Sequence, residues 1–87
     1  MPAYHAHPGV IYTPLDEQEA VLLHLETKLY YTLNETGRRI WELASAGRTP
    51  AEVAAALAAE YDVTPEAAAA KVQQLIHELT RERLLVE

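Results

Sequence analysis

The sequence changes character at Asn34, and this change restricts the fold more than any other feature. Before Asn34, three runs rich in β-branched, leucine and tyrosine side chains occupy residues 10–13, 20–25 and 29–33. Such runs, separated by polar residues, favour strands. After Asn34, alanine, leucine, glutamate and arginine predominate, which favours helices. Strands followed by helices predict an α+β domain, with a three-stranded antiparallel sheet followed by three helices.

The connections between the three β runs are short and polar. Residues 14–19 and 26–28 separate them, so a meander is the simplest arrangement. The run 29–33 then becomes an edge strand. Because side chains alternate across a strand, Leu29, Tyr31 and Leu33 share one face, and Tyr30 and Thr32 lie on the other.

The helical half carries clear boundary signals. Asn34 is a suitable N-cap for a first helix, and Gly47 ends it. The segment Thr49-Pro50-Ala51-Glu52 predicts a capping box with proline at the first helical position. Thr64-Pro65-Glu66 repeats this type of start and predicts a helix over 65–81. The apolar residues of that helix recur at the spacing of one buried face: Ala68, Val72, Leu75, Ile76 and Leu79.

A chain of 87 residues is long enough for one domain. We expect residues 1–8 to form a flexible N-terminus and residues 9–87 to form the domain. Residues 84–86 are apolar and could dock as a short terminal strand or as a tail. No internal repeat or interdomain linker is evident.

The composition excludes several classes of protein. The chain has no cysteine, which rules out disulfides and thiolate sites. Its formal net charge of −6 opposes nucleic-acid binding, since DNA and RNA binders concentrate lysine and arginine. No apolar run approaches the roughly 20 residues that span a membrane, and the N-terminus lacks the features of a signal peptide. We therefore expect a cytoplasmic protein that binds neither nucleic acid nor membrane.

The sequence offers no catalytic constellation. Its one serine, Ser45, has no histidine at a suggestive spacing, and the three glycines are too far apart for a phosphate loop. His5 and His7 could form a metal pair but are more typical of a solvated tail. His24 and His77 lack companions at metal-ligand spacing and are expected at the surface. Neighbouring carboxylates lie in turns and on polar faces. We predict no enzyme activity, no metal site and no cofactor.

Three helices after a hairpin have the shape of a winged helix-turn-helix, with residues 65–81 in the place of the recognition helix. A DNA reader presents several basic or amide side chains there. The polar face of this helix is nearly neutral, although the arrangement of the helices fits DNA binding. Its polar residues are Lys71, Gln73, Gln74, His77, Glu78 and Arg81.

The predicted edge strand, residues 28–33, has high β propensity, no proline and a single charge. Natural proteins usually protect such an edge against aggregation. An unprotected edge can serve to capture a peptide by strand addition. Alternatively, a terminal segment or a dimer partner covers it. The residues alone leave both interpretations open.

The chain resembles the PqqD family over roughly residues 10–86. The most specific part is the run Leu29-Tyr30-Tyr31-Thr32-Leu33-Asn34-Glu35-Thr36-Gly37, with Trp41 four residues later. The weaker matches that continue the pattern are Ile40, Glu42-Leu43, Gly47, Thr49, Glu52-Val53, Leu57, Tyr61, Val72, Leu75-Ile76, Leu79 and Leu84-Leu85. One departure is Thr27-Lys28, where many relatives carry Thr-Gly before the third strand.

The resemblance implies a leader-peptide recognition element of ribosomally synthesised, modified peptide pathways. Members of the family hold the leader of a precursor peptide as an extra antiparallel strand on the third strand, in a groove shared with the third helix. They deliver it to modifying enzymes and have no catalysis of their own. A free-standing domain of this size is most similar to the leader-binding proteins of lasso peptide biosynthesis, whose partners are a leader peptidase and a cyclase. The alternatives are a PqqD-type chaperone for a radical enzyme in quinone cofactor synthesis, and an acidic winged-helix DNA-binding or dimerisation module.

The resemblance also assigns the site residues. The pairing strand comprises Lys28, Leu29, Tyr30, Tyr31, Thr32 and Leu33. The residues that line or underlie the groove are Val72, Leu75, Ile76 and Leu79. Tyr30 is a candidate anchor, and Lys71 and Arg81 are placed to steer an acidic leader. For Tyr31, Leu33, Leu75 and Leu79, a purely structural role in the core is an equal alternative.

Overall fold

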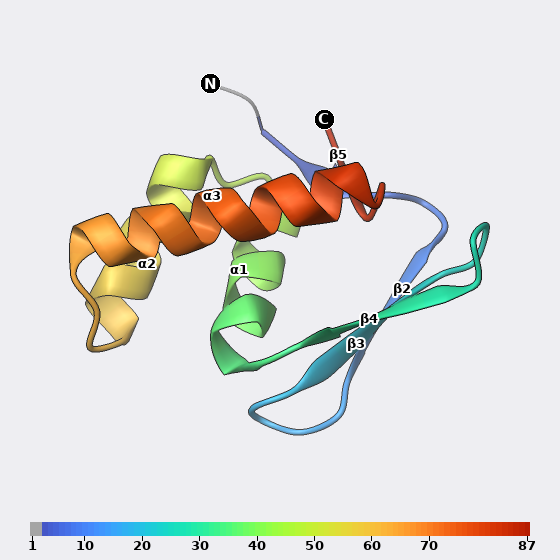
Figure 1. Cartoon of the computed structure of the whole chain (residues 1–87), viewed down its shortest axis with the longest axis horizontal. Coiled ribbons are helices and arrows are strands. Elements are labelled where there is room, and N and C mark those ends of the chain that lie inside the picture. The colour runs from blue at the N-terminus through green and yellow to red at the C-terminus, as the bar shows by residue number, and fades with distance from the viewer. Residues whose placement is uncertain (1–2) are drawn as a thin grey trace.

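The computed structural model describes residues 3–87. Its main sheet is an antiparallel meander in the order β2-β3-β4 (Figure 1). The strands are β2 (Val10–Pro14), β3 (Ala20–His24) and β4 (Leu29–Leu33). The register is continuous, with Leu22 of β3 opposite both Tyr12 and Tyr31. Strand β4 is therefore at one edge of the sheet, as the pattern of the sequence predicts.

Three helices follow on one side of the sheet (Figure 1). They are α1 (Glu35–Ser45), α2 (Pro50–Glu60) and α3 (Pro65–Arg81). Helix α2 packs against α1 and α3 rather than against the strands. Each begins at a side chain that accepts a backbone hydrogen bond, which satisfies an otherwise free N–H group. Asn34 Oδ1 accepts from Gly37 N–H at 2.8 Å, and Thr49 forms the predicted capping box with Glu52. The predicted fold class, an α+β domain with a three-stranded antiparallel sheet and three helices, is confirmed.

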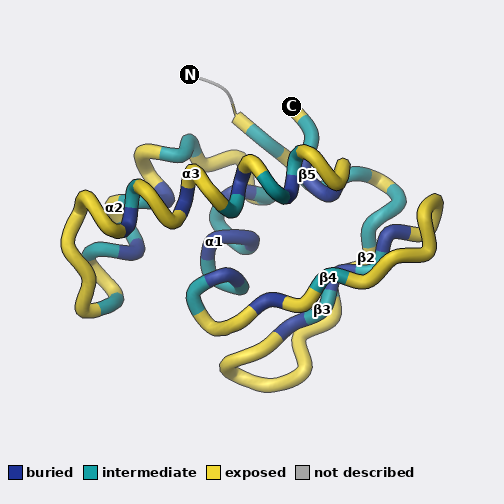
Figure 2. Tube along the Cα trace, in the orientation of Figure 1, coloured by how far each residue is buried: buried dark blue, intermediate teal, exposed yellow. Residues whose placement is uncertain are grey.

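The core lies between the sheet and the helices (Figure 2). Its buried apolar side chains are Ala20, Leu22, Leu33, Ile40, Trp41, Ala44, Val53, Leu57, Ala68, Val72, Ile76, Leu79, Leu84 and Leu85. On β3, the residues that face the helices are Ala20, Leu22 and His24, and all three are buried. The expectation of a surface position for His24 is therefore wrong, because alternation along β3 directs its ring into the core. His77 is exposed, as expected.

The described part of the N-terminal segment differs from the flexible tail expected over residues 1–8. Strand β1 (His5–Ala6) pairs antiparallel with β5 (Leu85–Val86). His7 N–H then donates to Leu84 C=O at 3.0 Å. The C-terminal apolar run thus docks as a strand against residues 5 and 6, so that β1 and β5 lie side by side (Figure 1). Residues 1 and 2 of the expected tail lie outside the described residues.

The turn before β4 carries a residue in the left-handed region. Lys28 has φ +64°, and its N–H donates to His24 C=O at 2.7 Å. A side chain at positive φ meets the following backbone, at a cost of about 1–2 kcal/mol. Glycine has no side chain, so a glycine at position 28 would avoid this contact.

Lys28→Gly is expected to raise the free energy of unfolding by about 0.5–1 kcal/mol, since relief of the strained φ exceeds the added entropy of the unfolded chain. For a domain of this size, the melting temperature rises by about 2–8 °C. Lys28→Ala is the matched control, because it removes the charge and keeps the strain. A Lys28→Gly protein no more stable than Lys28→Ala, measured by thermal and urea unfolding, would show that relief of the strain does not exceed the entropy added to the unfolded chain.

Candidate functional site

The outer edge of β4 is open. The described terminal strands β1 and β5 pair with each other and leave this edge uncovered. Leu29 and Tyr30 are 61% and 72% exposed, although both are large and hydrophobic. Within residues 3–87, the structure therefore excludes a terminal segment as the cover of the predicted edge strand.

The backbone groups that face this edge follow from the sheet register. Leu25 N–H donates to Gly9 C=O and Leu15 N–H to Glu19 C=O, at the two ends of the β2–β3 ladder. Antiparallel bonding alternates along a strand, so every second residue of β3 bonds to β2 and the others bond to β4. Ala20, Leu22 and His24 thus bond to Leu33, Tyr31 and Leu29.

The remaining residues of β4 point their backbone groups outward. These are Tyr30 and Thr32, which present N–H and C=O groups to any strand laid along the edge. Both side chains are exposed. The edge therefore offers the backbone N–H and C=O groups of two residues, whose neighbours on β4 bond to β3 instead.

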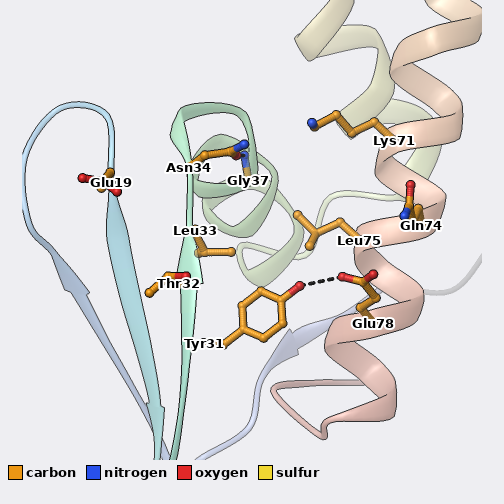
Figure 3. Close-up of a pocket in the computed structure, with 10 residues that line it drawn as sticks. All are labelled: Glu19, Tyr31, Thr32, Leu33, Asn34, Gly37, Lys71, Gln74, Leu75 and Glu78. Carbon is orange, nitrogen blue, oxygen red and sulfur yellow. Dashed lines mark hydrogen bonds between the residues drawn. The ribbon is translucent and has the colours of Figure 1, made fainter.

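A groove separates β4 from α3 (Figure 3). Its first cavity has a volume of about 410 Å³. The lining residues are Glu19, Tyr31, Thr32, Leu33, Asn34, Gly37, Lys71, Gln74, Leu75 and Glu78. In Figure 3, Tyr31 and Leu33 extend from β4 toward α3, and Leu75 extends from α3 toward β4. The floor is thus apolar, and polar side chains surround it.

A second cavity of about 400 Å³ continues the groove toward the start of β4. Its lining residues are His24, Thr27, Leu29, Tyr30, Tyr31, Glu78, Arg81, Glu82 and Leu84. Tyr31 and Glu78 line both cavities. The groove therefore has two compartments that meet at this pair of residues.

Tyr31 bridges the groove by donating its hydroxyl proton to Glu78 Oε2 at 2.6 Å (Figure 3). Partial burial of the phenol, together with the adjacent carboxylate acceptor, raises the pKa of Tyr31 to about 12. The phenol is therefore neutral at physiological pH and serves as a hydrogen-bond donor. The bridge links β4 to the C-terminal part of α3.

The raised pKa of Tyr31 makes stability depend on alkaline pH. The neutral phenol is favoured in the folded state, so its contribution is complete below the unfolded pKa of 10.0 and is lost as pH rises toward about 12. We expect the free energy of unfolding of the wild type to fall by on the order of 1–2 kcal/mol more than that of Tyr31→Phe over this range. Urea unfolding at pH 9 to 12 measures this difference. Parallel pH profiles would contradict the Tyr31–Glu78 bridge.

The structure separates the residues expected on α3 into two groups. Val72, Ile76 and Leu79 are buried in the core beneath the groove, at 1%, 5% and 0% exposure. Leu75 is half-buried and lines the first cavity. Lys71 and Arg81, the two expected steering residues, line the first and the second cavity respectively. The six strand residues 28–33 lie together, but Lys28 is in the turn and lines neither cavity.

Several residues that line the groove were not predicted from the sequence. Gln74 and Glu78 share a helix face with Lys71 and Leu75, at spacings of three and four residues, so helical periodicity could have identified them. Glu19 directly precedes β3 and His24 is its last residue, and neither has a local signal. The groove is lined by more acidic than basic side chains: Glu19, Glu78 and Glu82 against Lys71 and Arg81.

The open edge and the adjacent groove belong to a small α+β domain, whose candidate site is a free strand edge beside a two-compartment groove. None of the helices within residues 3–87 combines the length and the hydrophobicity of a membrane-spanning segment. Residues 19–85 match the family described as coenzyme PQQ synthesis protein D, PqqD. This chain belongs to the PqqD family, and the resemblance seen in the sequence is confirmed.

Two solved structures are similar to this chain over nearly its whole length. TbiB1 in complex with the TbiA(beta) leader peptide is 33% identical, with 93% of each chain covered and a TM-score of 0.85. A lasso peptide synthetase B1 complexed with the leader peptide is 26% identical, with 99% of this chain and 100% of that chain covered and a TM-score of 0.87. A comparison with curated proteins gave no match.

Proposed function

We propose that this chain is a non-catalytic adaptor that binds the leader of a ribosomal precursor peptide by strand addition to β4. It delivers the precursor to a leader peptidase, and from there to a cyclase, in lasso peptide biosynthesis. One observation carries the proposal: both similar structures hold leader peptides, and β4 here has a free edge beside a groove.

The geometry of strand addition follows from the edge. A leader strand would exchange backbone hydrogen bonds with Tyr30 and Thr32, the two residues whose pairing groups point outward. Side chains alternate along the added strand, so every second one would face the groove. The two cavities would receive these side chains, and the exposed ring of Tyr30 would contact the leader on the opposite face.

The charges support a peptide partner over DNA. Arg39 forms a bidentate ion pair with Glu60, at 2.8 and 2.9 Å, and Arg38 contacts Glu42 at 3.3 Å. These carboxylates already occupy the guanidinium groups that a phosphate would need. The net charge of −6 adds a general repulsion of the DNA backbone.

A second candidate is a chaperone for a radical enzyme in quinone cofactor synthesis, favoured by the description of the family. This function would use the same edge and groove. The enzyme that responds to the adaptor therefore distinguishes the two candidates.

The test is a fluorescence-anisotropy titration of the full chain with a labelled leader peptide from the precursor gene next to its own gene. A scrambled leader and a random DNA duplex are the controls. Saturable binding of the leader alone is expected. Salt-sensitive DNA binding without leader binding would overturn the proposal in favour of a winged-helix DNA-binding protein.

Delivery requires a second measurement with the neighbouring leader peptidase. We expect this chain to accelerate cleavage of the full precursor and to have no effect on a precursor with a scrambled leader. Peptidase activity that is independent of this chain would contradict delivery, while leaving leader binding intact.

A further inference from the structure

His24 is a buried polar side chain with one unsatisfied nitrogen. The residue is 2% exposed at the end of β3, and its Nδ1 accepts a hydrogen bond from Glu26 N–H at 3.2 Å. A neutral imidazole that accepts at Nδ1 carries its proton on Nε2. The Nε2 atom is buried and has no hydrogen-bond partner among residues 3–87. His24 therefore holds a free N–H donor inside the protein.

The ring of His7 packs against the ring of His24 but provides no hydrogen-bond partner for its Nε2 atom. The rings of His7 and His24 lie 4.7 Å apart between centroids, at 42°. His7 Nδ1 accepts from Gly9 N–H at 2.9 Å, and its Nε2 is 3.7 Å from a carboxylate oxygen of Glu26. Both imidazoles are thus oriented by backbone donors, so rotation of the His24 ring toward another partner would break its own backbone contact.

The second cavity borders His24, so a partner for this donor would approach the ring from there, although the Nε2 atom is buried in the free protein. His24 lines this cavity, beside the start of β4 and opposite Leu29 in the register. Glu78 and Glu82 contribute two carboxylates to the lining, against the single guanidinium of Arg81. An excess of negative charge disfavours a carboxylate ligand, whereas an N–H donor requires an acceptor. The chemistry that fits both conditions is an uncharged oxygen, in an amide or a hydroxyl group.

We propose that His24 Nε2–H is the hydrogen-bond donor of a specificity subsite in the second cavity. The subsite takes an uncharged, oxygen-bearing side chain from the peptide strand added to β4. This assignment rests on the proposed function and extends it, because it names the side-chain chemistry that one compartment selects. A buried donor left unsatisfied in the free protein lowers its stability, and the bound peptide restores the missing hydrogen bond.

The first test compares two substitutions of His24 in the full chain. His24→Leu has a similar volume and no donor, whereas His24→Gln can place an N–H donor near the position of Nε2. We expect His24→Leu to bind the leader about tenfold more weakly, with a melting temperature equal to or above that of the wild type. His24→Gln should bind within about threefold of the wild type.

The second test identifies the acceptor on the synthetic leader peptide. Each uncharged oxygen-bearing residue is replaced in turn by its closest apolar counterpart: tyrosine by phenylalanine, threonine by valine, serine by alanine, and asparagine or glutamine by leucine. One replacement is expected to weaken binding to the wild type by about tenfold and to leave binding to His24→Leu unchanged. This coupling in a double-mutant cycle assigns the residue in the subsite.

The outcomes separate this subsite from the proposed function. Equal leader affinity of the wild type and His24→Leu overturns the subsite and leaves strand addition intact. A parallel loss of stability and affinity in both variants also overturns it, since His24 would then be a structural residue. The subsite is also overturned if no replacement in the leader shows coupling to His24→Leu in the double-mutant cycle. Failure of the wild type to bind the leader overturns the proposed function and this assignment together.

Discussion

Thr32→Pro is expected to weaken leader binding about 10- to 100-fold while the domain stays folded. The reason is the direction of one backbone group: the N–H of Thr32 points to the open edge and is not part of the β3–β4 ladder. Proline removes this donor and places its ring where the added strand would lie. An edge strand tolerates proline at such an outward position. Anisotropy titration measures the loss, and circular dichroism with thermal unfolding checks the fold.

Two variants serve as controls for this result. Thr32→Ala keeps the N–H donor and should retain most of the affinity. Tyr31→Pro removes an N–H that bonds to Leu22 within the sheet, so it should lower stability strongly. A folded Thr32→Pro protein with native affinity would show that the leader does not pair with β4 at this position.

Leu79→Ala is expected to lower the free energy of unfolding by about 2–5 kcal/mol, since it leaves a cavity in the core. Leu79 is 0% exposed, on the face of α3 that packs into the protein. Natural domains are stable by about 0.05–0.15 kcal/mol per residue, which is on the order of 4–13 kcal/mol for this chain. This one substitution could therefore remove much of the total stability. Urea unfolding measures the change.

Leu75→Ala is the matched substitution one turn earlier on the same helix. Leu75 is half-buried and lines the first cavity, so its truncation should cost at most about 1 kcal/mol of stability. It should weaken leader binding about 3- to 10-fold through lost apolar contact. Equal effects of both substitutions on stability, with no effect of Leu75→Ala on binding, would place Leu75 in the core and outside the site.

The groove shows how a small domain can combine stability with an open site. The buried side of α3 is formed by Val72, Ile76 and Leu79. The side that faces the groove carries Leu75 and Glu78. The Tyr31–Glu78 hydrogen bond holds β4 and α3 at a fixed separation in the free protein. A peptide strand would thus meet a preformed groove, which reduces the entropy lost on binding.

The local elements were largely predictable because their signals are local. Three β runs, Asn34 as N-cap, the capping box at Thr49 and the helix over 65–81 all agree with the structure. Each depends on residues close in sequence, through alternation, helical periodicity or capping. The edge position of β4 also followed from the sequence, because short connections favour a meander.

The burial of His24 could not be predicted in this way. Its environment depends on His7, on Leu84 after α3 and on the face of β3 that turns toward the helices, and no local pattern joins these segments. The pairing of β1 with β5 joins the two ends of the chain and was missed for the same reason. Two-residue strands have too little sequence for alternation to be seen.

Local patterns were enough to predict the order of the elements and the edge position of β4, because hydrophobic periodicity and helix caps act over a few residues. The resemblance to the family rested on the motif over residues 29–37. The three-dimensional packing was needed to show which apolar residues of α3 line the groove and which lie in the core beneath it. It was also needed to show that Tyr31 donates across the groove to Glu78 and that His24 is buried beside the second cavity. Those features depend on how β4 and α3 pack across more than forty intervening residues. Packing of this kind is set by the fit of the whole core and leaves no periodic signal along the chain.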